Sequence, residues 1–191
     1  MTSASRTSRS GAIVVALIVV GLTGGCATAL SPDLMVPNGS ASAVRQTEWT
    51  IVVAPVTSEG KPNAAALEMT EQFRIGNEQF QEALVKALAA SGMFRSVANT
   101  GAANYELQTH IVSQQSQRTG FLAASSSVVV DYRLRENATD REVWHDTIIS
   151  EDAAEGAPFT EGVPGATKKS LAGAARRNVA EMLEKLAAKI R

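Results

Sequence analysis

The chain of 191 residues holds few side chains suited to catalysis or metal binding: one cysteine, Cys26, and two histidines, His110 and His145. Zinc sites need several such ligands at short spacing, and neither histidine has a second histidine or a cysteine nearby in the sequence. His145 and Asp146 are neighbours on an expected strand, so their side chains point to opposite faces. The sequence has no Gly-x-Ser-x-Gly elbow, phosphate loop or dinucleotide fingerprint. We therefore predict a non-enzymatic protein without catalytic residue, metal or cofactor; the alternative is a hydrolase or acyltransferase for lipid or glycan that uses His145 or His110.

Cys26 follows a sequence typical of an export signal. Arg6 and Arg9 lie in a Ser/Thr-rich start, the apolar run Ala12–Val20 comes next, and small residues precede the cysteine. This run is shorter than the roughly 20 apolar residues that a membrane-spanning helix needs. We therefore predict a cleaved signal peptide over residues 1–25 rather than a membrane-spanning anchor.

Residues 22–26, Leu-Thr-Gly-Gly-Cys, resemble the lipobox of bacterial lipoproteins, although Thr23 stands where that motif commonly has leucine. The resemblance implies cleavage between Gly25 and Cys26, a thioether-linked diacylglycerol on the thiol, and a further acyl chain such as palmitate on the freed amine. Several acyl chains hold a protein on a bilayer better than one, at about 0.8 kcal/mol per buried CH₂. Cys26 is thus the predicted lipidation site. The alternative is an ordinary signal peptide, with Cys26 as an incidental small residue.

Ala27 and the charge balance bear on location and partners. Lipoproteins retained in the inner membrane commonly have aspartate directly after the acylated cysteine, so Ala27 favours the outer membrane and a periplasm-facing domain.

The charge balance changes when the predicted signal peptide, with Arg6 and Arg9, is removed: 16 of the 18 basic residues remain against 19 acidic residues. A chain without a basic excess gives no indication of a nucleic-acid partner. We expect the membrane, through the lipid anchor, and another envelope protein as partners; the oligomeric state stays open.

Composition divides the exported chain into two parts. Residues 26–47 are rich in Ser, Ala, Pro, Gly and Asn without an apolar period, which predicts a flexible tether. A coil of roughly 20 residues has an end-to-end distance of about 25 Å, so the domain would stand off the membrane. The alternative is that part of this segment packs along the domain as an irregular strand. Residues 48–191 are numerous enough for one domain with a hydrophobic core.

The predicted domain alternates between strand and helix patterns. Strands are expected at residues 49–56, 93–98, 105–111, 128–134 and 142–149. One helix is expected to end at Gly92 after starting either near Ala65 or at Asn77, and a second covers residues 171–190 after a loop at 151–165. This order implies an α+β domain of two layers, with a small mixed or antiparallel sheet of four to five strands packed against two helices.

Several of these segments carry a resemblance to a known group. They are Ile51–Val56, Phe80–Leu84, Ser91–Phe94, Ala103–Leu107 and the hairpin from Tyr132 to Trp144. Over roughly residues 48–191 the chain resembles the small envelope lipoprotein domains related to the N-terminal domain of TolB, including curli-secretion lipoproteins and lipoprotein activators of penicillin-binding proteins. The resemblance implies a binding or assembly module, and no catalytic residue carries over because the group shares no catalytic motif. A self-assembling structural subunit is a further possibility that the curli-type members raise.

The connection Ser116–Ser125 is the candidate partner-binding segment. It is polar but contains two adjacent large apolar residues, Phe121 and Leu122, close to Arg118. Exposed aromatic side chains often anchor a partner, so we predict a binding tip here. The alternative is that Phe121 and Leu122 fold back onto the core.

Four basic residues near the start of the last helix are either a solvated face or a contact for anionic lipid or glycan. They are Lys168, Lys169, Arg176 and Arg177. Together these features predict a membrane-anchored periplasmic accessory lipoprotein that binds another component of the cell envelope.

Overall fold

The computed structural model describes residues 28–39, 46–59, 73–156 and 160–190. Three long antiparallel strands dominate it: β6 (Tyr105–Arg118), β7 (Ala123–Glu136) and β8 (Arg141–Glu155). Three short strands run parallel to β6 or to each other: β2 (Thr50–Val53), β3 (Thr57–Ser58) and β5 (Ser96–Ala98). The strand order is β5-β2-β6-β7-β8, and β3 pairs with β6 beside β2.

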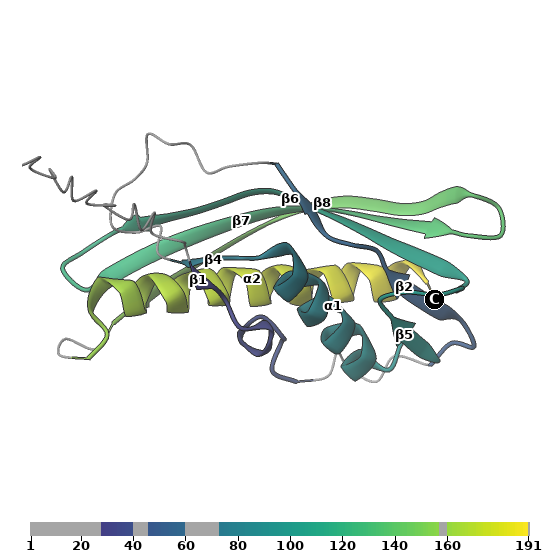
Figure 1. Cartoon of the computed structure of the whole chain (residues 1–191), viewed down its shortest axis with the longest axis horizontal. Coiled ribbons are helices and arrows are strands. Elements are labelled where there is room, and N and C mark those ends of the chain that lie inside the picture. The colour runs from purple at the N-terminus through teal and green to yellow at the C-terminus, as the bar shows by residue number, and fades with distance from the viewer. Residues whose placement is uncertain (1–27, 40–45, 60–72, 157–159, 191) are drawn as a thin grey trace, which may run out of the picture.

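Two helices, α1 (Asn77–Ser91) and α2 (Gly162–Lys189), lie on the same side of this sheet, as Figure 1 shows. The alternation in β7 explains why one face is covered. Val128, Val130, Tyr132 and Leu134 are fully buried against the helices, whereas the residues between them point away. We call the side of the sheet that faces away from the helices the open face. The predicted two-layer α+β fold is confirmed, but the sheet has six strands rather than four to five because β3 adds a short strand.

Helix α1 begins at Asn77, with Gly76 as the N-cap in an extended conformation. Of the two predicted starts, Asn77 is therefore the observed first helical residue, and it is not itself the cap. The positive φ of Gly92, 65°, ends the helix as predicted, since glycine adopts the left-handed conformation without strain. A short strand, β4 (Phe73–Arg74), precedes the helix.

Helix α2 is longer than predicted, and the expected loop at residues 151–165 is wrong at both ends. Strand β8 continues to Glu155, and the helix already begins at Gly162. Pro164 does not prevent this early start, because the first helical turn needs no intrahelical N–H donor. The apolar residues that recur at helical spacing in the predicted helix are buried: Leu171, Ala175, Val179, Met182 and Leu186 are at most 1% exposed.

The segment predicted as a flexible tether is folded from Thr28 to Gly39. Strand β1 (Thr28–Ala29) pairs in parallel with β4, and a short 3₁₀ helix, η1 (Pro32–Leu34), follows. Leu30 is 1% exposed and Met35 is fully buried, so both belong to the core. Periodicity did not predict this packing, because the two buried residues, Leu30 and Met35, are widely spaced and form no repeating pattern. For residues 28–39 the packed alternative therefore replaces the tether.

A buried polar contact joins the two layers. The Tyr132 hydroxyl donates to Asn178 Oδ1 at 2.8 Å, and the Asn178 amide donates to the backbone oxygen of Ile148 at 3.0 Å. Both side chains are fully buried, and burial raises the pKa of Tyr132 well above its ordinary value. Since a buried polar group is costly without a partner, these bonds fix how α2 sits on β7 and β8.

Candidate functional site

The turn between β6 and β7 carries the predicted binding tip. Strands β6 and β7 extend further than expected, so only residues 119–122 remain in the turn. The Phe121 side chain is 82% exposed, whereas Leu122 is half-buried and its carbonyl accepts from the Gly156 N–H at 2.8 Å. Arg118 donates to the carbonyl oxygens of Gly120 at 2.8 Å and Phe121 at 3.3 Å. Arg118 therefore shapes the turn, and Phe121 is the apolar group that projects from it.

The N-terminal segment is held close to this turn. Thr28 pairs with Phe73, and the Lys168 ammonium group of α2 lies 6.0 Å from the centre of the Phe73 ring. The Gln114 side chain of β6 bonds both backbone groups of Ile75, at 2.7 and 3.2 Å. Gln114 lies four residues before the end of β6, or about 13 Å along a strand.

The start of α2 completes the same end of the molecule. A Cβ placed on Gly156 would lie 2.9 Å from the carbonyl carbon of Gly162 and 3.2 Å from the Ala166 nitrogen, so the end of β8 touches the first turns of α2. We call the region formed by β1, β4, the first turns of α2 and the turn 119–122 the attachment end. Figure 1 shows β1, β4 and the start of α2 toward the same end of the long sheet.

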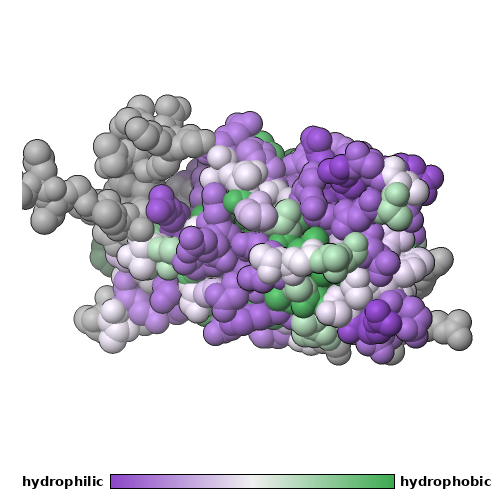
Figure 2. Space-filling model, turned by 45° about the vertical axis from the view of Figure 1, so that its right-hand side comes forward, coloured by the Kyte–Doolittle hydropathy of each residue, from purple (hydrophilic) through white to green (hydrophobic). Residues whose placement is uncertain are grey.

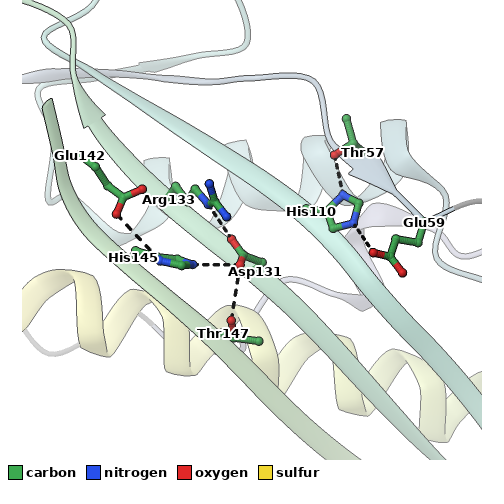
Figure 3. Close-up of polar contacts among 8 residues, drawn as sticks. All are labelled: Thr57, Glu59, His110, Asp131, Arg133, Glu142, His145 and Thr147. Carbon is green, nitrogen blue, oxygen red and sulfur yellow. Dashed lines mark hydrogen bonds and ion pairs between the residues drawn. The ribbon is translucent and has the colours of Figure 1, made fainter. Parts of the chain in front are cut away.

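Both histidines lie on the open face, within a row of polar side chains (Figure 3). His145 Nε2 lies 2.9 Å from Asp131 Oδ2, and its Nδ1 lies 3.9 Å from Glu142 Oε1. Arg133 Nε donates to Asp131 Oδ1 at 3.2 Å. Asp146 pairs instead with Lys185 of α2 at 3.0 Å, so His145 and Asp146 point to opposite faces as predicted.

The surroundings of Asp131 favour its charged form. Partial burial alone would raise its pKa, but the hydrogen bonds from His145 and Arg133 outweigh this effect, and the pKa of Asp131 is lowered from its ordinary value. Such a carboxylate accepts hydrogen bonds and does not donate a proton near neutral pH. Asp131 thus acts as the centre of an ionic cluster on the open face.

The second histidine makes similar contacts at the other side of the open face. His110 Nδ1 lies 2.8 Å from the Thr57 hydroxyl oxygen, and Nε2 lies 3.8 Å from Glu59 Oε1. In both histidines the two ring nitrogens face oxygen atoms of the protein, as Figure 3 shows. A general base needs one nitrogen directed at a substrate proton. In this structure both imidazole rings are therefore engaged by neighbouring side chains of the open face.

One small hollow lies between the N-terminal segment and the helices. Where Val36 and Pro37 meet α1 and Leu183 of α2, the hollow has a volume of only about 10 Å³, room for roughly one water molecule. Within residues 28–39, 46–59, 73–156 and 160–190, no three His, Cys, Asp or Glu side chains are placed to hold a metal ion. Figure 2 shows a mainly hydrophilic surface on which hydrophobic residues gather near the middle of the view.

The basic residues of α2 are used in different ways. Lys169 pairs with Glu161, and Arg177 pairs with Asp152 at 2.7 Å. Lys168 is exposed over the Phe73 ring. The predicted cleavage site Gly25–Cys26 and the residue Ala27 lie outside the described residues, and so does the apolar run Ala12–Val20. In the part of the chain that the structure describes, no helix is both long and apolar enough to cross a membrane.

Two features of the open face were not predicted. Asp131 lies in the predicted strand 128–134, but its place beside His145 follows only once the β7–β8 register is known. Ile149 is 64% exposed and pairs with the half-buried Val129 on the same face. Asp131 and Ile149 lie in a hairpin that the sequence predicts. Their neighbours across the strands depend on the register, which shifts by one residue at Val143, a bulge near the turn.

Comparison with known proteins gives the fold alone. No family model matches the chain, and no curated protein matches its sequence. A DUF330 protein from Xanthomonas campestris is similar in structure, with a TM-score of 0.64 and 15% identity over 85% of this chain and 95% of that one. A hypothetical protein from Chlamydia trachomatis has a TM-score of 0.54 and 11% identity over 75% and 98% of the two chains. A PelC dodecamer from Paraburkholderia phytofirmans has a TM-score of 0.50 and 15% identity over 78% and 93%. The resemblance to TolB N-terminal-like domains remains a prediction.

Proposed function

We propose that this protein is an acyl-anchored accessory lipoprotein of the cell envelope, and that its domain binds another envelope component without catalysing a reaction. The observation that carries the proposal is Cys26, which follows a sequence typical of an export signal and is separated from Thr28 by one residue, Ala27. Outer-membrane location and the TolB-like affiliation belong to the same proposal, on the basis of Ala27 and the segments between Ile51 and Trp144.

The open face is the surface we assign to a protein partner. Ile149 and Val129 provide an apolar centre, and the ionic cluster around Asp131 lies beside it. An exposed large apolar residue next to polar groups is typical of a binding surface. A partner that covers Ile149 would bury a large aliphatic side chain that water now surrounds.

Site-specific crosslinking tests this assignment in the full chain in cells. A photo-crosslinking residue at position 149 is expected to capture one specific envelope component. The same group at Ala138, in the turn between β7 and β8, is the control, since Ala138 is exposed and Ile149 lies eight residues, or about 26 Å, along β8 from that turn. The partner proposal fails if position 149 gives no adduct above that control while the protein is present at its native level.

The absence of catalysis is part of the proposal and has its own test. An envelope hydrolase or acyltransferase would require His145 or His110 to act on a substrate, yet the ring nitrogens of both face protein oxygens. We expect no turnover by the full chain on panels of ester and glycoside substrates. Turnover that His145→Ala or His110→Ala abolishes would reverse this part of the account.

Self-association is a second candidate function. Strand β8 is 15 residues long and pairs with β7 along one edge; its other edge has no partner strand among the described residues. A long unpaired edge is a template for pairing with another chain. One structural neighbour is a dodecamer, the PelC protein. The mass of the full chain in detergent tests this: a mass that stays monomeric at all concentrations excludes it.

A further inference from the structure

We propose that the attachment end rests directly on the membrane surface, with the Phe121 side chain inserted into the lipid. The inference depends on the proposed acylation of Cys26 and adds the orientation of the domain. It replaces the picture of a domain that stands off the bilayer on a flexible tether.

The chain between the proposed lipid anchor and the folded domain is very short. Two peptide units separate Cys26 from Thr28, so their Cα atoms are at most about 7 Å apart. The acyl chains of Cys26 would lie in the hydrocarbon layer, which places its backbone in the headgroup region. That region is about 5–7 Å thick on each side of a bilayer. Thr28 would therefore lie at the membrane surface or within the headgroups.

Thr28 is also held firmly on the domain. The parallel pairing of β1 with β4 holds it, and the Leu30 N–H donates to the Arg74 carbonyl oxygen at 2.9 Å. Leu30 and Met35 are buried in the core behind it. A further ion pair joins Asp33 to Lys86 of α1 at 2.7 Å. A membrane contact at Thr28 thus brings the attachment end to the bilayer as one body.

The attachment end also presents an exposed aromatic side chain. Phe121 is 82% exposed, the largest fraction of any large apolar side chain among the described residues. In water this exposure is unfavourable, whereas at a membrane interface the ring is buried among lipid. The Arg118 side chain holds the carbonyl oxygens of the turn, which satisfies backbone groups that would otherwise approach lipid without a partner.

Charge at the attachment end also fits a lipid surface. Arg74, Arg118 and Lys168 are exposed, and none of them forms an ion pair with another described residue. Glu155 is an exposed acid at the same end, opposite Ala123 at the end of β7, and the charges of Glu161 and Lys169 at the start of α2 cancel in their ion pair. The three basic side chains exceed this charge, so anionic headgroups complement the end.

The test places a fluorophore at the tip of the anchored full chain. In Phe121→Cys the new thiol is the one free thiol once Cys26 is acylated, because the chain has no other cysteine. Ala138→Cys, labelled in the same way, is the matched control at the opposite turn, about 43 Å away along β7. Both proteins are reconstituted into vesicles of phosphatidylethanolamine and phosphatidylglycerol, with and without a lipid that carries a shallow nitroxide quencher.

We expect the quencher to reduce the fluorescence at position 121 by half or more and to leave position 138 unchanged. Flotation of the same vesicles reports the anchor independently. Protein that floats with the vesicles but is unquenched at position 121 overturns the membrane contact alone and leaves the proposed function standing. Protein that does not float overturns both. Quenching at position 121 that disappears when an envelope extract is added would assign the tip to a protein partner instead and contradict the inference.

Discussion

The packing of Leu30 and Met35 leads to the most detailed prediction. Leu30 is 1% exposed and Met35 is fully buried, and each was expected to lie in a flexible tether. Replacing a buried Leu or Met with Ala costs about 2–5 kcal/mol, because apolar contacts are lost and a cavity remains. Domains are stable by only about 5–15 kcal/mol, so Leu30→Ala alone should remove a large part of the free energy that keeps this segment packed on the domain.

Urea unfolding of the full chain measures the loss of global stability, and hydrogen exchange measures local opening of the segment. If the segment unfolds only with the whole domain, Leu30→Ala lowers the free energy of unfolding by about 2–5 kcal/mol. If residues 28–35 open on their own, the same loss appears as faster exchange of their amides, with the Leu30 N–H as the main reporter because it donates to the Arg74 carbonyl oxygen. Either outcome requires the wild-type segment to be protected.

Leu34→Ala is the matched control for this experiment. Leu34 belongs to the same short helix, η1, but is 38% exposed. We expect a clearly smaller change, in the range of a partly exposed site. Two results would refute the reasoning: a Leu30 amide in the wild-type protein that exchanges as fast as an unstructured peptide, or equal effects of Leu30→Ala and Leu34→Ala.

Three further predictions concern the core and the open face. Tyr132→Phe removes the donor to Asn178 Oδ1, 2.8 Å away, and should cost about 1–3 kcal/mol of unfolding free energy in a urea titration, because a buried acceptor loses its partner. His145→Ala removes a hydrogen bond that lowers the pKa of Asp131, so that pKa should rise in an NMR titration. The pKa of Asp131 is lower in the folded state than in the unfolded state. The ionised Asp131 therefore stabilises the fold above its unfolded-state pKa, and this stabilisation is lost as the pH falls through its folded-state pKa. In His145→Ala the folded-state pKa is higher, so the loss should occur at a higher pH. Ile149→Ser should change stability by less than about 0.5 kcal/mol, since the side chain is 64% exposed, and should still reduce capture of a partner by crosslinkers on the open face.

Each of these has a result that would count against it. Unchanged stability of Tyr132→Phe would mean that water or another donor reaches Asn178. An unchanged pKa of Asp131 in His145→Ala would mean that Arg133 and burial, not His145, determine it. Strong destabilisation by Ile149→Ser would show that Ile149 is buried in solution, for instance by a second copy of the chain.

Much of the fold could be predicted from periodicity. The alternation of Val128, Val130, Tyr132 and Leu134 gave β7, and the helical spacing from Leu171 to Leu186 gave α2, because both elements bury one regular face. The ends of these elements were less predictable. Strand β6 continues from Ile111 to Arg118 through polar residues, since strand pairing with β7 rather than apolar burial holds that part.

The candidate site was only partly predictable for a similar reason. Phe121 was identified from an apolar pair in a polar connection, and the structure places it in an exposed turn. The closeness of the N-terminal segment to that turn depends on contacts between residues far apart in sequence, such as Thr28 with Phe73 and Gln114 with Ile75. Two buried side chains, Leu30 and Met35, form no periodic pattern, so local sequence rules could not detect that this segment folds.

The most direct test of the central claim is the intact mass of the mature protein isolated from membranes. We expect an N-terminus at Cys26 that carries a diacylglycerol and a further acyl chain, and loss of both in Cys26→Ser, which should also leave the membrane fraction. A mature N-terminus at another residue, or an unmodified Cys26 thiol on protein that still stays with the membrane, would contradict the acyl anchor and the membrane-bound orientation that depends on it.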